Sequence, residues 1–87
     1  MKTEIVQENQ VAVDIKKIIS EIARINISYL EDDIKIREEL GIDSLMAIEI
    51  IAKCEKKFAI VIDETKLESL SSIGDFINYV IGRINKL

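Results

Sequence analysis

One segment of this chain decides its fold. It reads Glu39-Leu40-Gly41-Ile42-Asp43-Ser44-Leu45-Met46-Ala47-Ile48-Glu49. Gly41 favours a turn before a new helix. Asp43 or Ser44 can serve as the N-cap of that helix, because either side chain can accept a hydrogen bond from the first helical turn. Apolar residues then recur as far as Cys54, so we expect this helix to end at about Lys57.

Two further helices are expected on either side of this one. Upstream, apolar residues recur at three- and four-residue spacings, as in an amphipathic helix: Val11, Ile15, Ile18, Ile19, Ile22 and Ile25. Downstream, Ser72-Ile73-Gly74-Asp75 predicts a capping box that opens a last helix. The residues of that helix expected to face inward are Ile73, Phe76, Ile77, Val80, Ile81 and Ile84.

The segments between these helices are expected to contain little regular secondary structure. Residues 26–43 predict an ordered loop, held by four apolar residues among the charges: Leu30, Ile34, Ile36 and Leu40. Residues 58–62 look locally like a strand but have no partner strand, so we expect an extended connector. Asp63 can then cap a short helical turn that runs through Leu67. The fold class is therefore all-α, a small bundle of three longer helices and one short helix.

Length and composition bound the function. The chain has 87 residues, of which 1–9 are expected to form a flexible N-terminal lead-in and 10–87 a single domain. Histidine is absent and Cys54 is the single cysteine, so a Cys/His metal cluster, a histidine relay and an internal disulfide are excluded. Cys54 itself is expected to be a small buried hydrophobic residue.

The charge balance bounds the partners. A formal net charge of −4 makes nucleic acid and anionic lipid surfaces poor partners. The longest apolar run, residues 58–62, is far below the ~20 residues that a membrane span needs. With a lone cysteine and no apolar signal segment at the N-terminus, we expect a cytoplasmic protein without membrane insertion.

Ser44 is the candidate for chemistry. A hydroxyl in the first turn of a helix is exposed, and the helix N-terminus favours an attached anion by about 0.3–1 kcal/mol. That position suits a phosphodiester. The chain contains no base that would activate Ser44 as a nucleophile, so another protein must modify it. The alternative is that Asp43 and Ser44 only cap the helix, a contribution of about 1 kcal/mol.

The wider context of Ser44 resembles the acyl carrier protein family over about residues 10–84. In that family, the serine that bears phosphopantetheine lies in a Gly-x-Asp-Ser-Leu motif that opens the second helix, and residues 41–45 match this motif. The first helix with Ile15-Lys16-Lys17-Ile18-Ile19, the lead-in Glu39-Leu40-Gly41 and the segment Phe76-Ile77-Asn78-Tyr79-Val80 match as well.

The resemblance implies a carrier rather than an enzyme. Ser44 would hold a covalent 4'-phosphopantetheine derived from coenzyme A, attached by a phosphopantetheinyl transferase. Acyl intermediates would be tethered to this arm as thioesters and delivered to acyltransferases, ketosynthases or other acyl-processing enzymes at raised effective concentration. We expect the carrier to act as a monomer.

Further site residues follow from the resemblance and from their place beside Ser44. Leu45 and Met46 are expected to form the apolar centre of the partner contact, with Asp43 and Glu49 as its charged rim. The lining of an acyl pocket is expected from Ile36, Ile48, Ile51 and Ile62. Ile48 and Ile51 should then face the bundle interior, where they could equally be plain core residues.

The pathway stays open between two kinds of carrier. Residues 44–58 carry three lysines against two glutamates, whereas many fatty-acid carriers have a strongly acidic second helix. The acidic residues are concentrated upstream instead, in residues 31–43. This shift suggests a specialised carrier in polyketide or peptide synthesis, and a fatty-acid carrier is the other hypothesis. An unmodified helical interaction module is the alternative from a different class.

Overall fold

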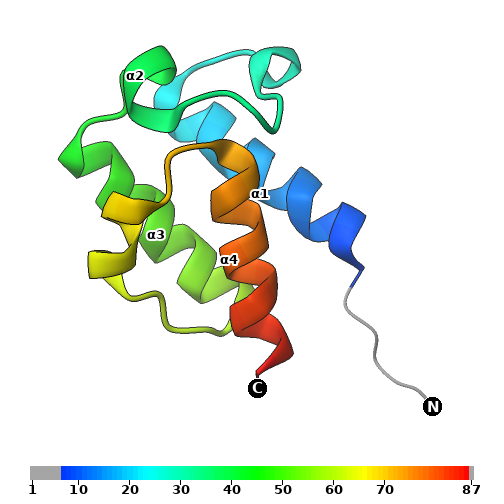
Figure 1. The fold of residues 1–87 in the computed structure, drawn as a ribbon. Coiled ribbons are helices and arrows are strands. Elements are labelled where there is room, and N and C mark those ends of the chain that lie inside the picture. The colour runs from blue at the N-terminus through cyan, green and yellow to red at the C-terminus, as the bar shows by residue number, and fades with distance from the viewer. Residues whose placement is uncertain (1–6, 87) are drawn as a thin grey trace.

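The computed structural model describes residues 7–86, apart from the side chains of residues 67 and 68. This part of the chain is all-helical, as the sequence predicts (Figure 1). It contains four α-helices: α1 (Glu8–Ala23), α2 (Ile36–Leu40), α3 (Ser44–Phe58) and α4 (Ile73–Asn85). Two short 3-10 helices accompany them, η1 (Ile27–Tyr29) and η2 (Glu64–Ser69). Three of the α-helices are long and one is short, which confirms the predicted all-α bundle. The short α-helix is α2, whereas the short helix predicted after Asp63 is the 3-10 helix η2.

Helix α1 packs against both α3 and α4. Its buried residues are Val11, Ile15, Ile18 and Ile19, all members of the predicted apolar stripe. The helix begins at Glu8, so residues 8 and 9, which the sequence assigns to the lead-in, are helical; residues 1–6 lie outside the described part of the chain. It ends where Arg24 adopts the left-handed conformation and its amide donates to the Ser20 carbonyl.

The connection between α1 and α3 is more regular than an ordered loop. Asn26 caps η1 by accepting a hydrogen bond from the Ser28 amide, and α2 occupies the end of the segment. Leu30 is almost fully buried, while the other three predicted contacts, Ile34, Ile36 and Leu40, are half-buried. The apolar anchoring is therefore confirmed, but α2 is a helix that the sequence analysis placed in a loop.

This connection is joined to the start of α4 by three backbone hydrogen bonds. The amides of Ile73 and Gly74 donate to the carbonyls of Ile34 and Asp32, at 3.0 and 2.8 Å, and the Ile36 amide donates to Ser71 at 2.9 Å. The approach is close enough to favour glycine, because a Cβ on Gly74 would lie 3.1 Å from the Asp32 carbonyl oxygen, a tight contact. We call this set of contacts the 32–74 join.

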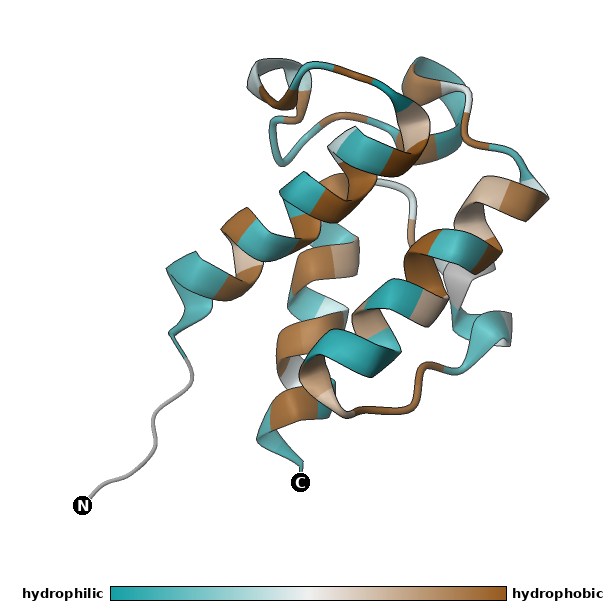
Figure 2. Cartoon of the chain, turned by 180° about the vertical axis from the view of Figure 1, so that it is seen from behind, coloured by the Kyte–Doolittle hydropathy of each residue, from teal (hydrophilic) through white to brown (hydrophobic). Residues whose placement is uncertain are grey.

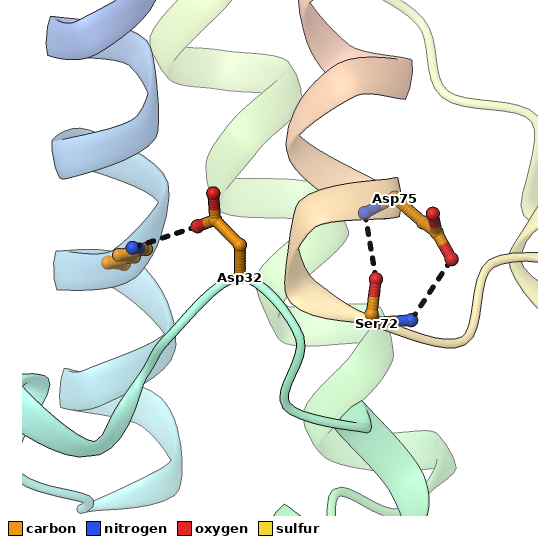
Figure 3. Close-up of polar contacts among 4 residues, drawn as sticks. Asp32, Ser72 and Asp75 are labelled. Carbon is orange, nitrogen blue, oxygen red and sulfur yellow. Dashed lines mark hydrogen bonds and ion pairs between the residues drawn. The ribbon is translucent and has the colours of Figure 1, made fainter.

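Two side-chain interactions flank the 32–74 join (Figure 3). The Asp32 carboxylate forms an ion pair with Lys16 of α1 at 3.0 Å. On the other side, the Asp75 amide donates to the Ser72 hydroxyl at 3.1 Å, and the Ser72 amide donates back to the Asp75 carboxylate at 3.3 Å. The capping box predicted for the last helix is thereby confirmed.

The segment between α3 and η2 is an extended connector, as predicted, and appears as a continuous hydrophobic stretch in Figure 2. Ala59 ends α3 in the left-handed conformation, and Ile60 and Ile62 are buried on either side of an exposed Val61. Polar side chains hold its backbone: the Ile62 amide donates to the Glu55 carboxylate, and Arg83 Nε donates to the Val61 carbonyl. The short turn after Asp63 is confirmed as η2, where Asp63 Oδ1 accepts from the Thr65 amide.

The hydrophobic core lies between α1, α3 and α4. Its least exposed residues are Ile15, Ile19, Leu30, Ile73, Val80 and Cys54. Burial of this apolar surface is what holds isoleucine-rich segments in helices, since isoleucine itself is a mediocre helix former. Within the described residues no buried side-chain nitrogen or oxygen lacks a hydrogen-bond partner.

Candidate functional site

Ser44 is the first residue of α3, at a turn whose geometry the local sequence determines. Gly41 ends α2 with φ +67°, a left-handed conformation that favours glycine. Asp43 then caps α3: its carboxylate accepts from the Met46 amide at 2.9 Å, and its carbonyl accepts from the Ala47 amide at 2.9 Å. Of the two caps that the sequence allowed, Asp43 is therefore the one used, which leaves the Ser44 hydroxyl available.

The surroundings of Ser44 fit an attached phosphate. Its side chain is exposed. Within the described residues, the amides of Ser44 and Leu45 have no hydrogen-bond acceptor, because Asp43 takes only the next two amides of the turn. Free amides at the positive end of a helix bind an anion well. The chain holds no histidine that could deprotonate Ser44, so the site can carry a group but cannot attach one itself.

The four residues predicted for partner contact lie around this helix start. Leu45 is 69% exposed, a large apolar side chain left open to solvent. Asp43 and Glu49 are exposed as well. Met46 differs from the other three because it is half-buried and packs against the core.

Ile48 does not face the interior, so this part of the predicted pocket is wrong: its side chain is 52% exposed. Each residue of an α-helix advances by about 100°, and the core side of α3 is centred between Ile50, Ile51 and Cys54. Ile48 lies about 110° from that centre and shares the outer side of the helix with Leu45. Apolar character alone did not distinguish the two sides.

A small cavity of about 50 Å³ lies inside the bundle near the start of α3. Ile36 and Ile51, two of the four predicted pocket residues, line it. Ile62 does not line it, although it is buried, because it lies on the connector beyond the far end of α3. The lining residues that sequence reasoning missed are Ile19, Arg37, Ile42, Ala47, Ile50, Leu70 and Phe76. All of them except Arg37 are apolar, and nothing in the sequence separated cavity walls from other apolar positions.

Cys54 is a core residue, as predicted. Its side chain is completely buried, and this burial, reinforced by the nearby Glu55 carboxylate, raises the pKa of the thiol to about 12. The thiol is therefore protonated at neutral pH and is not a nucleophile. No group of three or more potential metal ligands occurs in the part of the chain that the structure describes. Among residues 7–86, no helix is long and apolar enough to cross a membrane.

Comparison with known proteins finds one matching family and several relatives named as acyl carrier proteins. The family described as "Phosphopantetheine attachment site" matches residues 13–80. An acyl carrier protein of Thermotoga maritima is 32% identical over 66 residues, which cover 76% of this chain and 82% of that protein. The acyl carrier protein of Wolinella succinogenes is 33% identical over 67 residues, covering 77% and 88%. That of Exiguobacterium sibiricum is 32% identical over 73 residues, covering 84% and 92%.

The matched range contains the helix start at Ser44 and every long helix in whole or in part. Proteins of this kind are non-enzymatic carriers that act with a phosphopantetheinyl transferase and with acyl-processing enzymes. Their prosthetic group is 4'-phosphopantetheine, which the exposed serine and free amides at the start of α3 can accommodate. The chain belongs to the acyl carrier protein family.

Proposed function

We propose that Ser44 carries the 4'-phosphopantetheine arm and that the chain presents acyl groups on it as thioesters. The observation that supports this most directly is that different residues cap α3 and expose a hydroxyl at its start. Asp43 caps the helix, so the exposed Ser44 hydroxyl is not needed for capping. Joined to Ser44 Oγ by a phosphodiester, the arm would supply the thiol that forms the thioester.

The residues around Ser44 would orient this arm without taking part in acyl chemistry. The unpaired amides of Ser44 and Leu45 can donate hydrogen bonds to the phosphate, and the Asp43 cap holds both in helical geometry. Acyl transfer is then left to the partner enzymes. The cavity lined by Ile36 and Ile51 is the candidate site for the acyl end of the arm, since its walls are almost entirely apolar.

Partner enzymes would contact the outer side of α3. Leu45 and Ile48 lie one turn apart there, both exposed, and form the apolar centre of this proposed contact. Asp43 and Glu49 provide the charged rim, and Met46, next to Leu45, is half-buried and packs against the core. The contact therefore keeps the predicted residues and gains Ile48, which moves from the pocket to the surface.

Fatty-acid synthesis and specialised polyketide or peptide synthesis are both open to a carrier of this family. The exposed lysines of α3, Lys53, Lys56 and Lys57, favour the specialised role. An enzyme that presents lysine and arginine to an acidic second helix would meet like charges here. We therefore expect weak loading and elongation by a generic fatty-acid synthase set, improved by Lys56→Glu with Lys57→Glu. Efficient loading of the unsubstituted chain would favour fatty-acid synthesis instead.

Intact mass spectrometry tests the proposal. The apo protein is incubated with coenzyme A and a broad-specificity phosphopantetheinyl transferase, and we expect a mass gain of one phosphopantetheine. Ser44→Ala should abolish the gain. Ser28→Ala removes another exposed serine, which lies within the 3-10 helix η1, and should leave the gain intact. A folded wild-type chain that gains no mass contradicts the assignment and favours an unmodified interaction module. A Ser44→Ala variant that still gains mass contradicts it in another way, because the arm would then be attached to a different residue.

A further inference from the structure

An open groove with a basic lining lies between α1 and α3, away from the cavity. Figure 2 shows these two helices side by side with hydrophilic bands on both. The groove has a volume of about 410 Å³, with residues of α1 and α3 along its two sides: Asp14, Lys17, Ile18, Glu21, Lys53, Lys56 and Lys57. We call it the basic groove.

Positive charge dominates the basic groove, although the chain as a whole has a net charge of −4. Its four lysines face two carboxylates, and one of these, Asp14, lies 3.9 Å from Lys57 and is largely covered. Lys17, Lys53 and Lys56 are exposed and form no ion pair with any described residue. The groove therefore offers unneutralised ammonium groups to a partner.

The basic groove is continuous with the proposed partner contact on α3. Leu45 and Lys56 are eleven residues apart, so they differ by only about 20° around the helix and lie about 16 Å apart along its axis. A protein interface of ordinary size covers roughly 800 Å² on each partner, a patch wider than this distance. An enzyme that docks on Leu45 thus also reaches the lysines.

We propose that the basic groove receives an acidic rim of the acyl-processing enzymes that dock on α3, so that these enzymes present carboxylates at this place. This inference rests on the proposed carrier function. Opposite charges across a rim speed association and reject wrong partners, whereas lysine or arginine at the same place would be repelled. An anionic membrane is the poorer occupant, because the acidic residues 31–43 and the net charge of −4 would be repelled by a continuous anionic surface.

The test titrates the apo protein with an octaglutamate peptide at low salt. Binding is monitored by the amide chemical shifts of the protein in NMR. We expect shifts confined to the lining of the basic groove, and binding that weakens as salt is added. Lys53→Glu with Lys56→Glu should weaken binding at least about tenfold, because each lost attraction becomes a repulsion. Lys66→Glu with Lys86→Glu is the matched control: it changes the net charge equally at two exposed lysines outside the groove.

Four outcomes overturn the inference. Shifts spread over the whole surface, or equal weakening by both double variants, would show that net charge rather than the groove governs binding. Failure of the peptide to bind while phosphatidylglycerol vesicles bind through the same lysines would assign the groove to lipid. The mass gain on Ser44, measured on the same preparation, reports the carrier function separately, so a peptide that does not bind to a modifiable carrier removes only this inference.

Discussion

Asp43 combines two roles that a pair of substitutions can separate. Its carboxylate caps α3 through the Met46 amide at 2.9 Å, and its charge is also proposed to contribute to the rim of the partner contact. Asp43→Ala removes both the cap and the charge. Asp43→Asn removes only the charge, since asparagine caps a helix about as well as aspartate.

The structure sets the size of the two effects on stability. Loss of a capping side chain costs about 1 kcal/mol, and loss of a negative charge at a helix N-terminus costs about 0.3–1 kcal/mol. We therefore expect Asp43→Ala to lower the free energy of unfolding by about 1–2 kcal/mol and Asp43→Asn by less than about 1 kcal/mol. For a domain of this size, each kcal/mol corresponds to roughly 4–8 °C in Tm. Urea and thermal unfolding followed by circular dichroism measure both.

Modification kinetics measure the second role of Asp43. If its charge contributes to the partner rim, both variants should slow phosphopantetheine transfer by a similar factor, mainly through the association rate. Ser72→Ala is the matched control, because it removes the cap of α4 at a similar cost in stability but away from α3. Equal destabilisation by Asp43→Asn and Asp43→Ala would refute the capping argument. Slowing by Ser72→Ala as large as that by Asp43→Ala would refute the docking role.

Three further predictions follow from the site and its surroundings. Leu45→Ala should slow modification about fivefold or more while Val61→Ala, at an equally exposed residue of the connector, does not; stopped-flow or mass kinetics compare them. Cys54 should react with a thiol reagent only at the rate of global unfolding, because its thiol is buried and its pKa is raised to about 12. The hydrogen bond from the Ser72 amide, above all, holds the pKa of Asp75 below its ordinary value of 3.8. The stability that the ionised carboxylate contributes is therefore present at neutral pH and lost as pH falls through that lowered pKa. Asp75→Asn should weaken this loss of stability at acid pH, measured by unfolding at a series of pH values.

Helix starts could be predicted from the sequence because their signals are local. Asp43 and the pair Ser72 and Asp75 satisfy amides within three residues of themselves, so a few letters contain the whole interaction. The long helices follow from apolar spacing for a similar reason. The family resemblance then favoured Ser44 as the attachment site, where the local sequence alone also allowed a plain helix cap.

Features that depend on distant neighbours could not be predicted. Helix α2 has five residues and no buried side chain, so it leaves no apolar stripe, and its first amide is held by Ser71, far along the chain. Ile48 and Ile51 have identical side chains and lie less than one turn apart, yet one is exposed and the other is buried. Only the position of α1 and α4 around α3 decides which side is inner.

The 32–74 join also fixes which parts of the bundle can open together. The amides of Ile36, Ile73 and Gly74 have their acceptors across the join, so their exchange with deuterium requires the α1–α3 connection to separate from α4. Slow exchange at Ile36 would show that the start of the short helix α2 is protected as well as a core helix. Ile36 also lines the cavity, so its exchange rate in an acyl-loaded carrier distinguishes two ways of making room for the acyl group. A displacement of α3 leaves that rate unchanged, whereas a release of the 32–74 join accelerates it.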